Sequence, residues 1–365
     1  MNWITTLSAA TMILTSGTAI SGAAAAPIDI EIAAESHDMI WNAVAVDHGR
    51  VFVAGPRWTG SKGPSLALID GHGIARPYPS PQWNGWTPGV ANGTTFVNVN
   101  AIHLDGKGGL WAVDTGSPEF GGDPLPGAAK LVRLDLATDA VDRVIPLGPT
   151  AALAGSYIDD IRFNGDHAYL TDAGRPGLIV LDLRDGSTRR VLEGHGSVTA
   201  RPDRDIFLDG QPLTGPDGKP LHVHSDPLEV SPDGKWLHYG PLEGPWSRIE
   251  TRFLDDASLS PDELAEKVEP WANLPPVGGT VMDSNGDLYF TDLAANALRK
   301  RAADGTVTTL LVSPELHWVD APFIDTDHVL WLPVPQIDRA AMFNGGTSQI
   351  RWPIRLFRLP LGARP

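Results

Sequence analysis

A polar position recurs six times along this chain, and its residue types are those that carry out acid–base chemistry or bind cations. Each copy is followed by alternating apolar residues, then by Asp, Asn or Ser, a turn, and a strand that bears an aromatic side chain. The six residues at this position are Asn42, Asn100, Asp159, Asp226, Gly278 and Asp320. Five of them offer side-chain oxygens, and three of the five are carboxylates.

Three carboxylates gathered in one place do not all stay ionised unless something compensates their charge. Mixed carboxylate and amide oxygens are the ligands that Ca²⁺ prefers, so Asn100, Asp159, Asp226 and Asp320 are candidate ligands of a divalent cation such as Ca²⁺ or Zn²⁺. A carboxylate with a raised pKa acts instead as a general acid or base, which makes Asp159, Asp226 and Asp320 candidate catalytic residues. A third interpretation is structural: such residues also cap loops by accepting from backbone N–H groups.

Two histidines precede the fourth copy. His222, His224 and Asp226 alternate along one predicted strand and therefore share one face of it. Two imidazoles and a carboxylate in line can bind a transition metal. The alternative is that each histidine is satisfied by its own loop.

Tryptophans lie close to the repeated position. Trp41 and Trp318 come one and two residues before a copy, and Trp83 and Trp86 lie in a Pro/Gly-rich loop. Exposed rings of this kind stack on flat or cationic ligands, although they also hold loops down by packing. The predicted ligand-binding residues are Asn42, Asn100, Trp41, Trp318 and His224.

The elements that must position these residues are short strands. The copies follow one another at steps of 42 to 67 residues, a period typical of propellers and other repeat folds. Each step holds runs rich in Val, Ile, Leu, Tyr and Trp that are separated by Gly, Pro, Asp and Asn. Four such strands make one propeller blade. The sequence therefore predicts an all-β, six-bladed β-propeller of four-stranded antiparallel blades, with the repeated position forming a ring around the central channel.

Two further segments complete this prediction. Residues 27–34 alternate apolar and acidic side chains, and we expect this strand to close the last blade and remove its free edge. The sequence Ser-Pro-Asp-Glu at 260–263 predicts a helix to about residue 268, inserted in the fourth blade. No internal linker is apparent, so residues 27–365 are predicted to form a single domain.

The composition limits the partners. The formal net charge is −16 and the longest basic run is the triplet 299–301, which disfavours nucleic acid. A basic amphipathic helix for a membrane surface is also missing from the sequence. An acidic protein of this kind favours neutral or cationic small ligands. We expect a monomer that binds a small organic ligand.

The N-terminus indicates export. An apolar stretch is followed by the small residues 21–26, which suit a signal peptidase, so residues 1–26 are predicted to be a signal peptide and the protein to be secreted or periplasmic. The alternative, a membrane anchor, needs about 20 apolar residues, and Thr, Ser and Gly interrupt this stretch. The chain has no cysteine, so disulfides cannot close the fold. The usual sequence motifs of hydrolases and nucleotide-binding proteins are absent.

Several segments resemble the yellow / major royal jelly protein family in that family's order. They include VFVAGPRWTG (51–60), AIHLDGKGGLWAVDTG (101–116), AYLTDAGRPGLIVLDL (168–183) and LEVSPDGKWLHYGPL (228–242). The resemblance implies an exported six-bladed propeller with a ligand pocket at one end of the channel. Insect members include amine binders and proteins tied to dopachrome conversion, so an isomerase or tautomerase is expected, with a non-catalytic ligand-binding protein as the alternative.

A wider similarity is to gluconolactonase and senescence marker propellers, whose metal is held by Glu, Asn and Asp. Asp226 falls where that pattern has its Asn, and Gly278 falls where it has its catalytic Asp. Asn42 is nearest to the position of the Glu. Metal-dependent lactone hydrolysis is therefore a third interpretation, and it needs a different set of ligands, which Asp159 and Asp320 would supply.

Overall fold

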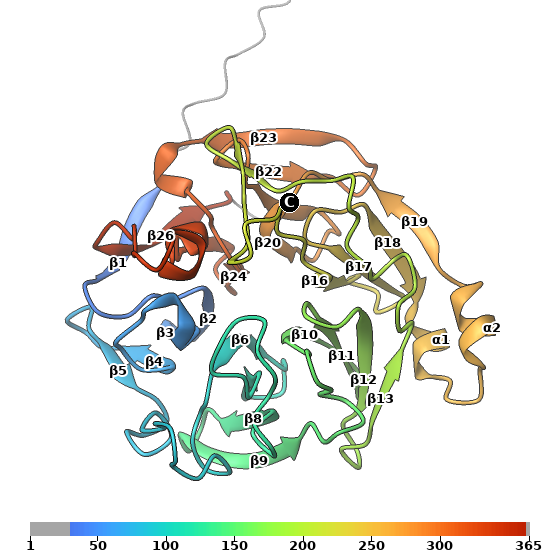
Figure 1. Cartoon of the computed structure of the whole chain (residues 1–365), viewed down its shortest axis with the longest axis horizontal. Helices are drawn as coiled ribbons and strands as arrows, with labels where there is room; N and C mark the ends of the chain where they lie inside the picture. Colours follow the sequence, from blue (N-terminus) through green and yellow to red (C-terminus); the bar gives the residue numbers. More distant parts are fainter. Residues whose placement is uncertain (1–29, 363–365) are drawn as a thin grey trace, which may run out of the picture.

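Six four-stranded antiparallel sheets surround a central axis in this computed structural model, which describes residues 30–362 (Figure 1). The predicted all-β, six-bladed propeller is confirmed. From the axis outward, blade 1 consists of β2 (Ala43–Asp47), β3 (Arg50–Ala54), β4 (Leu66–Ile69) and β5 (Ala75–Pro77). Blade 2 consists of β6 (Val99–Leu104), β7 (Gly109–Asp114), β8 (Lys130–Asp135) and β9 (Ala140–Pro146). Blade 3 consists of β10 (Ile158–Asn164), β11 (His167–Asp172), β12 (Gly177–Asp182) and β13 (Thr188–Val191).

The second half of the ring repeats this order. Blades 4 and 5 consist of β16 (Ser225–Val230), β17 (Trp236–Pro241), β18 (Trp246–Glu250) and β19 (Glu269–Ala272); β20 (Val277–Met282), β21 (Leu288–Asp292), β22 (Ala297–Arg301) and β23 (Val307–Val312). Blade 6 is built from both ends of the described chain, in the order β24 (Phe323–Ile324), β25 (Val329–Val334), β26 (Ile354–Pro360) and β1 (Glu31–Ser36).

The N-terminal strand closes the ring, as predicted. β1 pairs antiparallel with β26, with Ile32 opposite Phe357. Ion pairs of Arg355 with Glu35 and of Arg358 with Glu31 flank this pairing. Because the first described strand completes the last sheet, the ring is closed by hydrogen bonds and packing. The predicted signal peptide, residues 1–26, lies outside the described residues.

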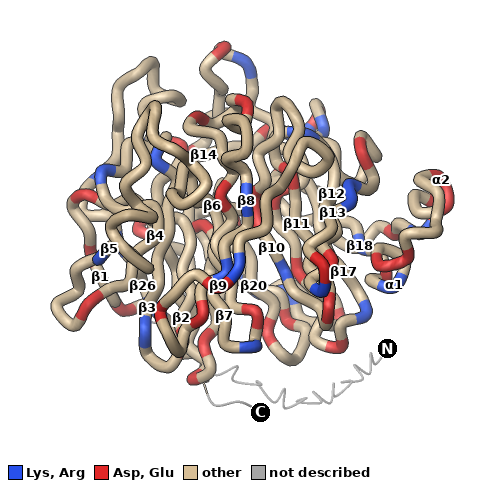
Figure 2. The backbone as a smooth tube through the Cα atoms, turned by 90° about the horizontal axis from the view of Figure 1, so that it is seen from below, with Lys and Arg blue, Asp and Glu red and all other residues tan. Residues whose placement is uncertain are grey.

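Several short elements are inserted between the strands of the six blades. The predicted helix of blade 4 is α2 (Pro261–Ala265), which begins with a capping box between Ser260 and Glu263 and ends earlier than predicted. A short helix α1 (Thr251–Asp255) precedes it, and a hairpin of β14 (Phe207–Leu208) and β15 (Gln211–Pro212) stands between blades 3 and 4. Long loops, including the one that carries β14, rise on one side of the ring (Figure 2). The 3₁₀ turns are Arg57–Thr59, Pro314–Leu316, Ile337–Arg339 and Ala341–Phe343.

The blades pack through apolar side chains. Trp111 of blade 2 is buried and its ring lies 5.6 Å from that of Phe163 in blade 3. Trp331 is buried in the cluster between blades 6 and 1. Both tryptophans, which lie on the second strands of their blades, are thus core residues. Among the described residues, no helix has the length and apolar character needed to cross a membrane.

The inner strands are irregular at one place. The pairing register shifts in β6 between Val99 and Ala101, and the inner strands of blades 3, 4 and 5 shift at the equivalent point. Such bulges are frequent beside functional sites because they redirect a side chain. In these four blades the redirected residue is the repeated polar position or its successor.

Candidate ligand site at the channel mouth

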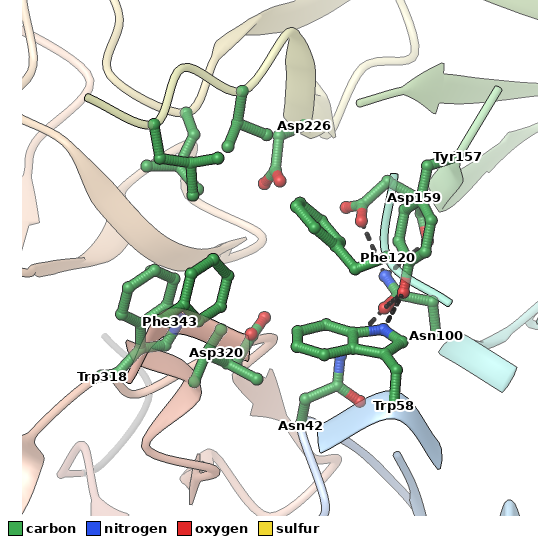
Figure 3. A pocket seen from close by; sticks show the side chains of 15 residues that line it. Asn42, Trp58, Asn100, Phe120, Tyr157, Asp159, Asp226, Trp318, Asp320 and Phe343 are labelled. Carbon is green, nitrogen blue, oxygen red and sulfur yellow. Dashed lines mark hydrogen bonds between the residues drawn. The ribbon is translucent and has the colours of Figure 1, made fainter. Parts of the chain in front are cut away.

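The six repeated residues line one cavity at the mouth of the channel, here called the mouth cavity. The carboxylates of Asp159, Asp226 and Asp320 project from three different blades toward a common space (Figure 3). The space open to the centre of a water molecule is about 50 Å³. At roughly 10–15 Å³ for each water, it admits about three to five waters or a small ligand fragment. The predicted ring therefore exists in the folded chain.

The same six residues also line a second space on the other side of the ring, here called the inner cavity. It offers about 20 Å³ to the centre of a water molecule and is also lined by Asp160 and Thr280. The ring is thus a polar layer that is reached from two sides. Asp160, the residue after the repeated position in blade 3, was not singled out from the sequence.

A directed chain of hydrogen bonds runs across one half of the mouth cavity. The indole Nε1–H of Trp58 donates to the hydroxyl of Tyr157 (2.9 Å), which donates to Oδ1 of Asn100 (2.9 Å). Nδ2 of Asn100 then donates to Oδ1 of Asp159 (2.7 Å). Nδ2 of Asn42 donates to the same Asn100 oxygen, at 3.4 Å. These bonds connect the loop of blade 1 to the carboxylate of blade 3.

Asn42 keeps one buried atom without a partner. Asn42 is 3% exposed, and its Oδ1 accepts no hydrogen bond from any residue in the range 30–362. Buried polar atoms are nearly always satisfied, so an exception needs an explanation. Because Nδ2 is already used toward Asn100, the free group is an acceptor, and a donor from a ligand or water would satisfy it.

The ring carboxylates hold their protons more tightly than ordinary aspartates. Burial and the charges of neighbouring carboxylates raise the pKa of Asp159 and of Asp226 well above the usual range. Burial also raises the pKa of Asp320 to about 7, although hydrogen bonds from Ala321 and Trp318 lower it. The charge of a neighbouring carboxylate contributes to all three raised pKa values, and for Asp320 this neighbour is Asp160. Raised pKa values are typical of carboxylates that act as general acids or bases.

A buried ion network lies beneath the ring. Nη1 of Arg162 is 2.7 Å from Oδ2 of Asp160, and its Nη2 is 2.9 Å from Oε1 of Glu229. Thr280 donates to the same oxygen of Glu229, at 2.9 Å. Burial lowers the pKa of Arg162, but the two carboxylates outweigh it and raise that pKa above its usual value. One cation therefore joins the inner strands of blades 3 and 4, and Thr280 extends the network to blade 5.

Aromatic side chains enclose the mouth cavity on its outer side. Trp58 lies 5.1 Å from Phe120 and 6.3 Å from Phe343, measured between ring centroids, and Phe120 lies 5.3 Å from Tyr157 (Figure 3). We call Trp58, Phe120 and Phe343 the mouth cluster. They come from loops of blades 1, 2 and 6, and sequence reasoning missed them. The only signal for Tyr157 was its place two residues before a repeated position, which it shares with Trp318.

Some predicted ligand-binding residues lie elsewhere. Trp41 is fully buried between blades 6 and 1, where its Nε1–H donates to the carbonyl of Arg355, so its expected place at the mouth was wrong. His224 lines neither cavity, because its Nδ1 accepts from the backbone N–H of Ala200. By contrast, Trp318 is buried and lines the mouth cavity, as do Asn42 and Asn100.

The remaining aromatic and imidazole candidates are structural. Trp83 packs on Phe96 at 5.0 Å, and Trp86 is buried in a small core cluster. They hold their own loop down. His222 bonds Glu243 instead of joining His224 and Asp226 in a metal site.

The presence of glycine at position 278 has a steric explanation. A Cβ built at this position would lie 2.2 Å from the carbonyl oxygen of Val319, which no real side chain tolerates. A Cβ at the neighbouring Gly279 would lie 2.6 Å from the carbonyl carbon of Asp320. The backbones of blades 5 and 6 therefore touch at the position where the lactonase pattern requires a catalytic aspartate.

The ring does not fit the divalent cation, Ca²⁺ or Zn²⁺, that the sequence allowed. No group of three or more His, Asp or Glu side chains within residues 30–362 is arranged to hold a metal ion. Asn100 uses its oxygen to accept from Tyr157 and turns its N–H group toward Asp159. It therefore presents a donor, where a metal needs an oxygen ligand. Asp159, Asp226 and Asp320 remain candidates for acid–base chemistry.

Solved structures share this fold at low sequence identity. Virginiamycin B lyase from Staphylococcus aureus is 12% identical, with 92% of this chain and 99% of that chain covered and a TM-score of 0.50. A streptogramin B lyase is 11% identical, with coverages of 87% and 77% and a TM-score of 0.46. At these identities the likeness concerns the fold alone. No curated protein sequence matches the chain.

A family match covers more than half of the 365 residues. Residues 97–310 match the family described as major royal jelly protein. This segment runs from the start of blade 2 into the last strand of blade 5, and it includes Asn100, Asp159, Asp226 and Gly278. The resemblance inferred from the sequence is thereby confirmed: the chain belongs to the major royal jelly protein family.

Proposed function

We propose that this protein is exported, binds a small organic molecule in the mouth cavity, and isomerises or tautomerises it by acid–base catalysis. The observation that carries the proposal is the set of three carboxylates with raised pKa values on the floor of a cavity whose outer side is aromatic. Perturbed carboxylates in a concave pocket are typical of catalytic sites.

The lining selects the ligand by charge and by hydrogen bonding. The lining residues include no Lys, Arg or His, so nothing in the cavity compensates an anion. The floor offers acceptors, namely the free Oδ1 of Asn42 and the carboxylate oxygens. A neutral or cationic molecule with an aromatic face and N–H or O–H donors is therefore the ligand class that fits. The mouth cluster contributes stacking surface.

The reaction requires two proton transfers and no change in oxidation state. An ionised ring carboxylate takes a proton from one end of a conjugated substrate, and a protonated one gives a proton to a carbonyl oxygen at the other end. Asp320, with a pKa of about 7, is suited to exchange between these two roles near neutral pH. Asn42 and Asn100 orient the substrate above Asp159, Asp226 and Asp320.

The test uses the methyl ester of dopachrome, a neutral coloured aminochrome chosen because of the family resemblance. We expect the wild-type protein to accelerate loss of its colour, and Asp226→Asn to lower turnover at least about 100-fold while the melting temperature does not fall. Full turnover by Asp226→Asn would remove Asp226 from the mechanism.

A non-catalytic ligand-binding protein is the second candidate, favoured by the mouth cluster itself. It predicts binding without turnover, with Trp318→Ala losing affinity and Asp320→Asn retaining it. Metal-dependent lactone hydrolysis is not supported, because backbone fills the space at Gly278 and the ring does not fit a metal.

A further inference from the structure

The hydroxyl of Tyr157 lies between the mouth cluster and the ring. Tyr157 is 2% exposed, and its backbone N–H is held by Oδ1 of Asp172 at 2.8 Å, which fixes the base of the side chain. Its hydroxyl accepts from Nε1 of Trp58 and donates to Oδ1 of Asn100. No other side chain of the described residues forms hydrogen bonds with both Trp58 of the mouth cluster and the Asn100 amide.

The donor-to-acceptor direction of these hydrogen bonds follows from the chemistry of indole. An indole N–H only donates, so the Tyr157 oxygen must accept from Trp58, and its single proton is left for Asn100. The Asn100 amide then has to point Oδ1 at Tyr157 and Nδ2 at Asp159. A side-chain amide has no such preference of its own, because its two ends are nearly the same size.

The consequence falls on Asp159. Among the described residues, the hydrogen bonds of its side chain reach only Oδ1, which accepts from Nδ2 of Asn100. Its second oxygen is left for whatever enters the mouth cavity. Holding one oxygen of a catalytic carboxylate and freeing the other fixes the place where a proton is exchanged.

We infer that Tyr157 is a positioning residue: through the orientation of Asn100 it presents one oxygen of Asp159 to the ligand, and through Trp58 it couples that orientation to the aromatic mouth. The catalytic part of this inference rests on the proposed function, whereas the coupling itself does not. A ligand that turns the Trp58 indole away would remove the donor that sets the direction of the chain.

The experiment reads the Asn100 side-chain amide by ¹⁵N–¹H NMR, assigned from its loss in Asn100→Asp. Tyr157→Phe keeps the ring but removes the hydroxyl, and we expect the Asn100 NH₂ signals to shift and to exchange with solvent at least about tenfold faster. Trp58 reaches Asn100 through two successive hydrogen bonds, so Trp58→Phe is expected to shift the same signals by a smaller amount.

Two control variants separate this relay from simple packing. Phe343→Leu removes a ring contact of Trp58 while leaving the hydrogen bonds and the Phe120–Tyr157 contact in place, and Tyr239→Phe removes another buried hydroxyl, which bonds Ser197. Neither should change the Asn100 signals. Unchanged Asn100 signals in folded Tyr157→Phe, or equal changes in Phe343→Leu, would overturn the inference. If Tyr157→Phe does not fold, Trp58→Phe decides in the same way.

A kinetic measurement tests the catalytic part separately. With the methyl ester of dopachrome, Tyr157→Phe should lower kcat roughly two- to tenfold, as expected for one neutral hydrogen bond, with KM nearly unchanged. A change in KM alone would contradict a role in positioning Asp159. If the wild-type protein does not turn over the probe, the proposed function fails, while the NMR result still decides the coupling.

Discussion

Replacing Arg162 with Met tests the ion network beneath the ring. Arg162 is 7% exposed on β10, and its guanidinium bonds both oxygens of Glu229 and one oxygen of Asp160. Met fills a similar elongated space and carries no charge. Among the described residues, the variant therefore leaves the buried Glu229 carboxylate with Thr280 as its one remaining side-chain donor.

The expected loss of stability is large. Removing one partner of a buried ion pair costs about 3–5 kcal/mol, because the remaining charge stays desolvated and unpaired. In a protein of this size each kcal/mol moves the melting temperature by about 2 °C, so Arg162→Met should melt roughly 6–10 °C lower. The double variant Arg162→Met/Glu229→Gln removes one of the two carboxylate charges that Arg162→Met leaves unpaired, the other being Asp160, and should recover part of this loss.

Urea denaturation and thermal melts followed by circular dichroism measure the effect. The matched control is Arg184→Met, whose pair with Asp182 lies at the surface with the arginine side chain 66% exposed. Surface pairs contribute about 0–1 kcal/mol, so this variant should melt close to wild type. An Arg162→Met protein as stable as the control, or a double variant less stable than Arg162→Met alone, would refute the reasoning.

Two further predictions concern the ring. Asp320→Asn should be more stable than wild type by an amount that grows from about pH 4 to pH 7 and vanishes below pH 4. The reason is that the folded carboxylate, with a pKa of about 7, keeps a proton that the unfolded chain releases near 3.8. Thermal melts across this pH range check the prediction, and a stability difference independent of pH would count against a titrating Asp320. Gly278→Ala should lower the free energy of unfolding by about 1–3 kcal/mol, because the added Cβ overpacks against Val319. Gly148→Ala, where a Cβ meets nothing within 4 Å, should melt like wild type. Equal melting temperatures of the two variants would show that the backbone yields freely.

Much of the fold was readable because its signals are local. The alternation of apolar residues, the turn residues and the repeated polar position predicted six blades, the ring and the closing strand. A capping box also placed α2 in blade 4. The hairpin of β14 and β15 was missed because its strands are two residues long and lack any apolar alternation.

The candidate site was readable only in part. The ring residues share one cavity because they lie at the same end of the inner strands: four are the second residue of such a strand, and Asn42 and Asp320 come shortly before β2 and β24. Trp41 was misplaced because one residue along a strand turns a side chain to the opposite face, and here that face is the core between blades. The mouth cluster was missed because its rings come from loops of three blades, which no periodicity describes.

The sequence by itself determined the number of blades, the closure of the ring and the identity of its polar position, since these depend on patterns that repeat along the chain. Only the tertiary structure decided what that position does. It placed Tyr157 between Trp58 and Asn100, left Oδ1 of Asn42 free, and put backbone where Gly278 interrupts the ring. The physical reason is that hydrogen-bond direction, steric contact and carboxylate pKa depend on groups brought together from different blades, far apart in sequence.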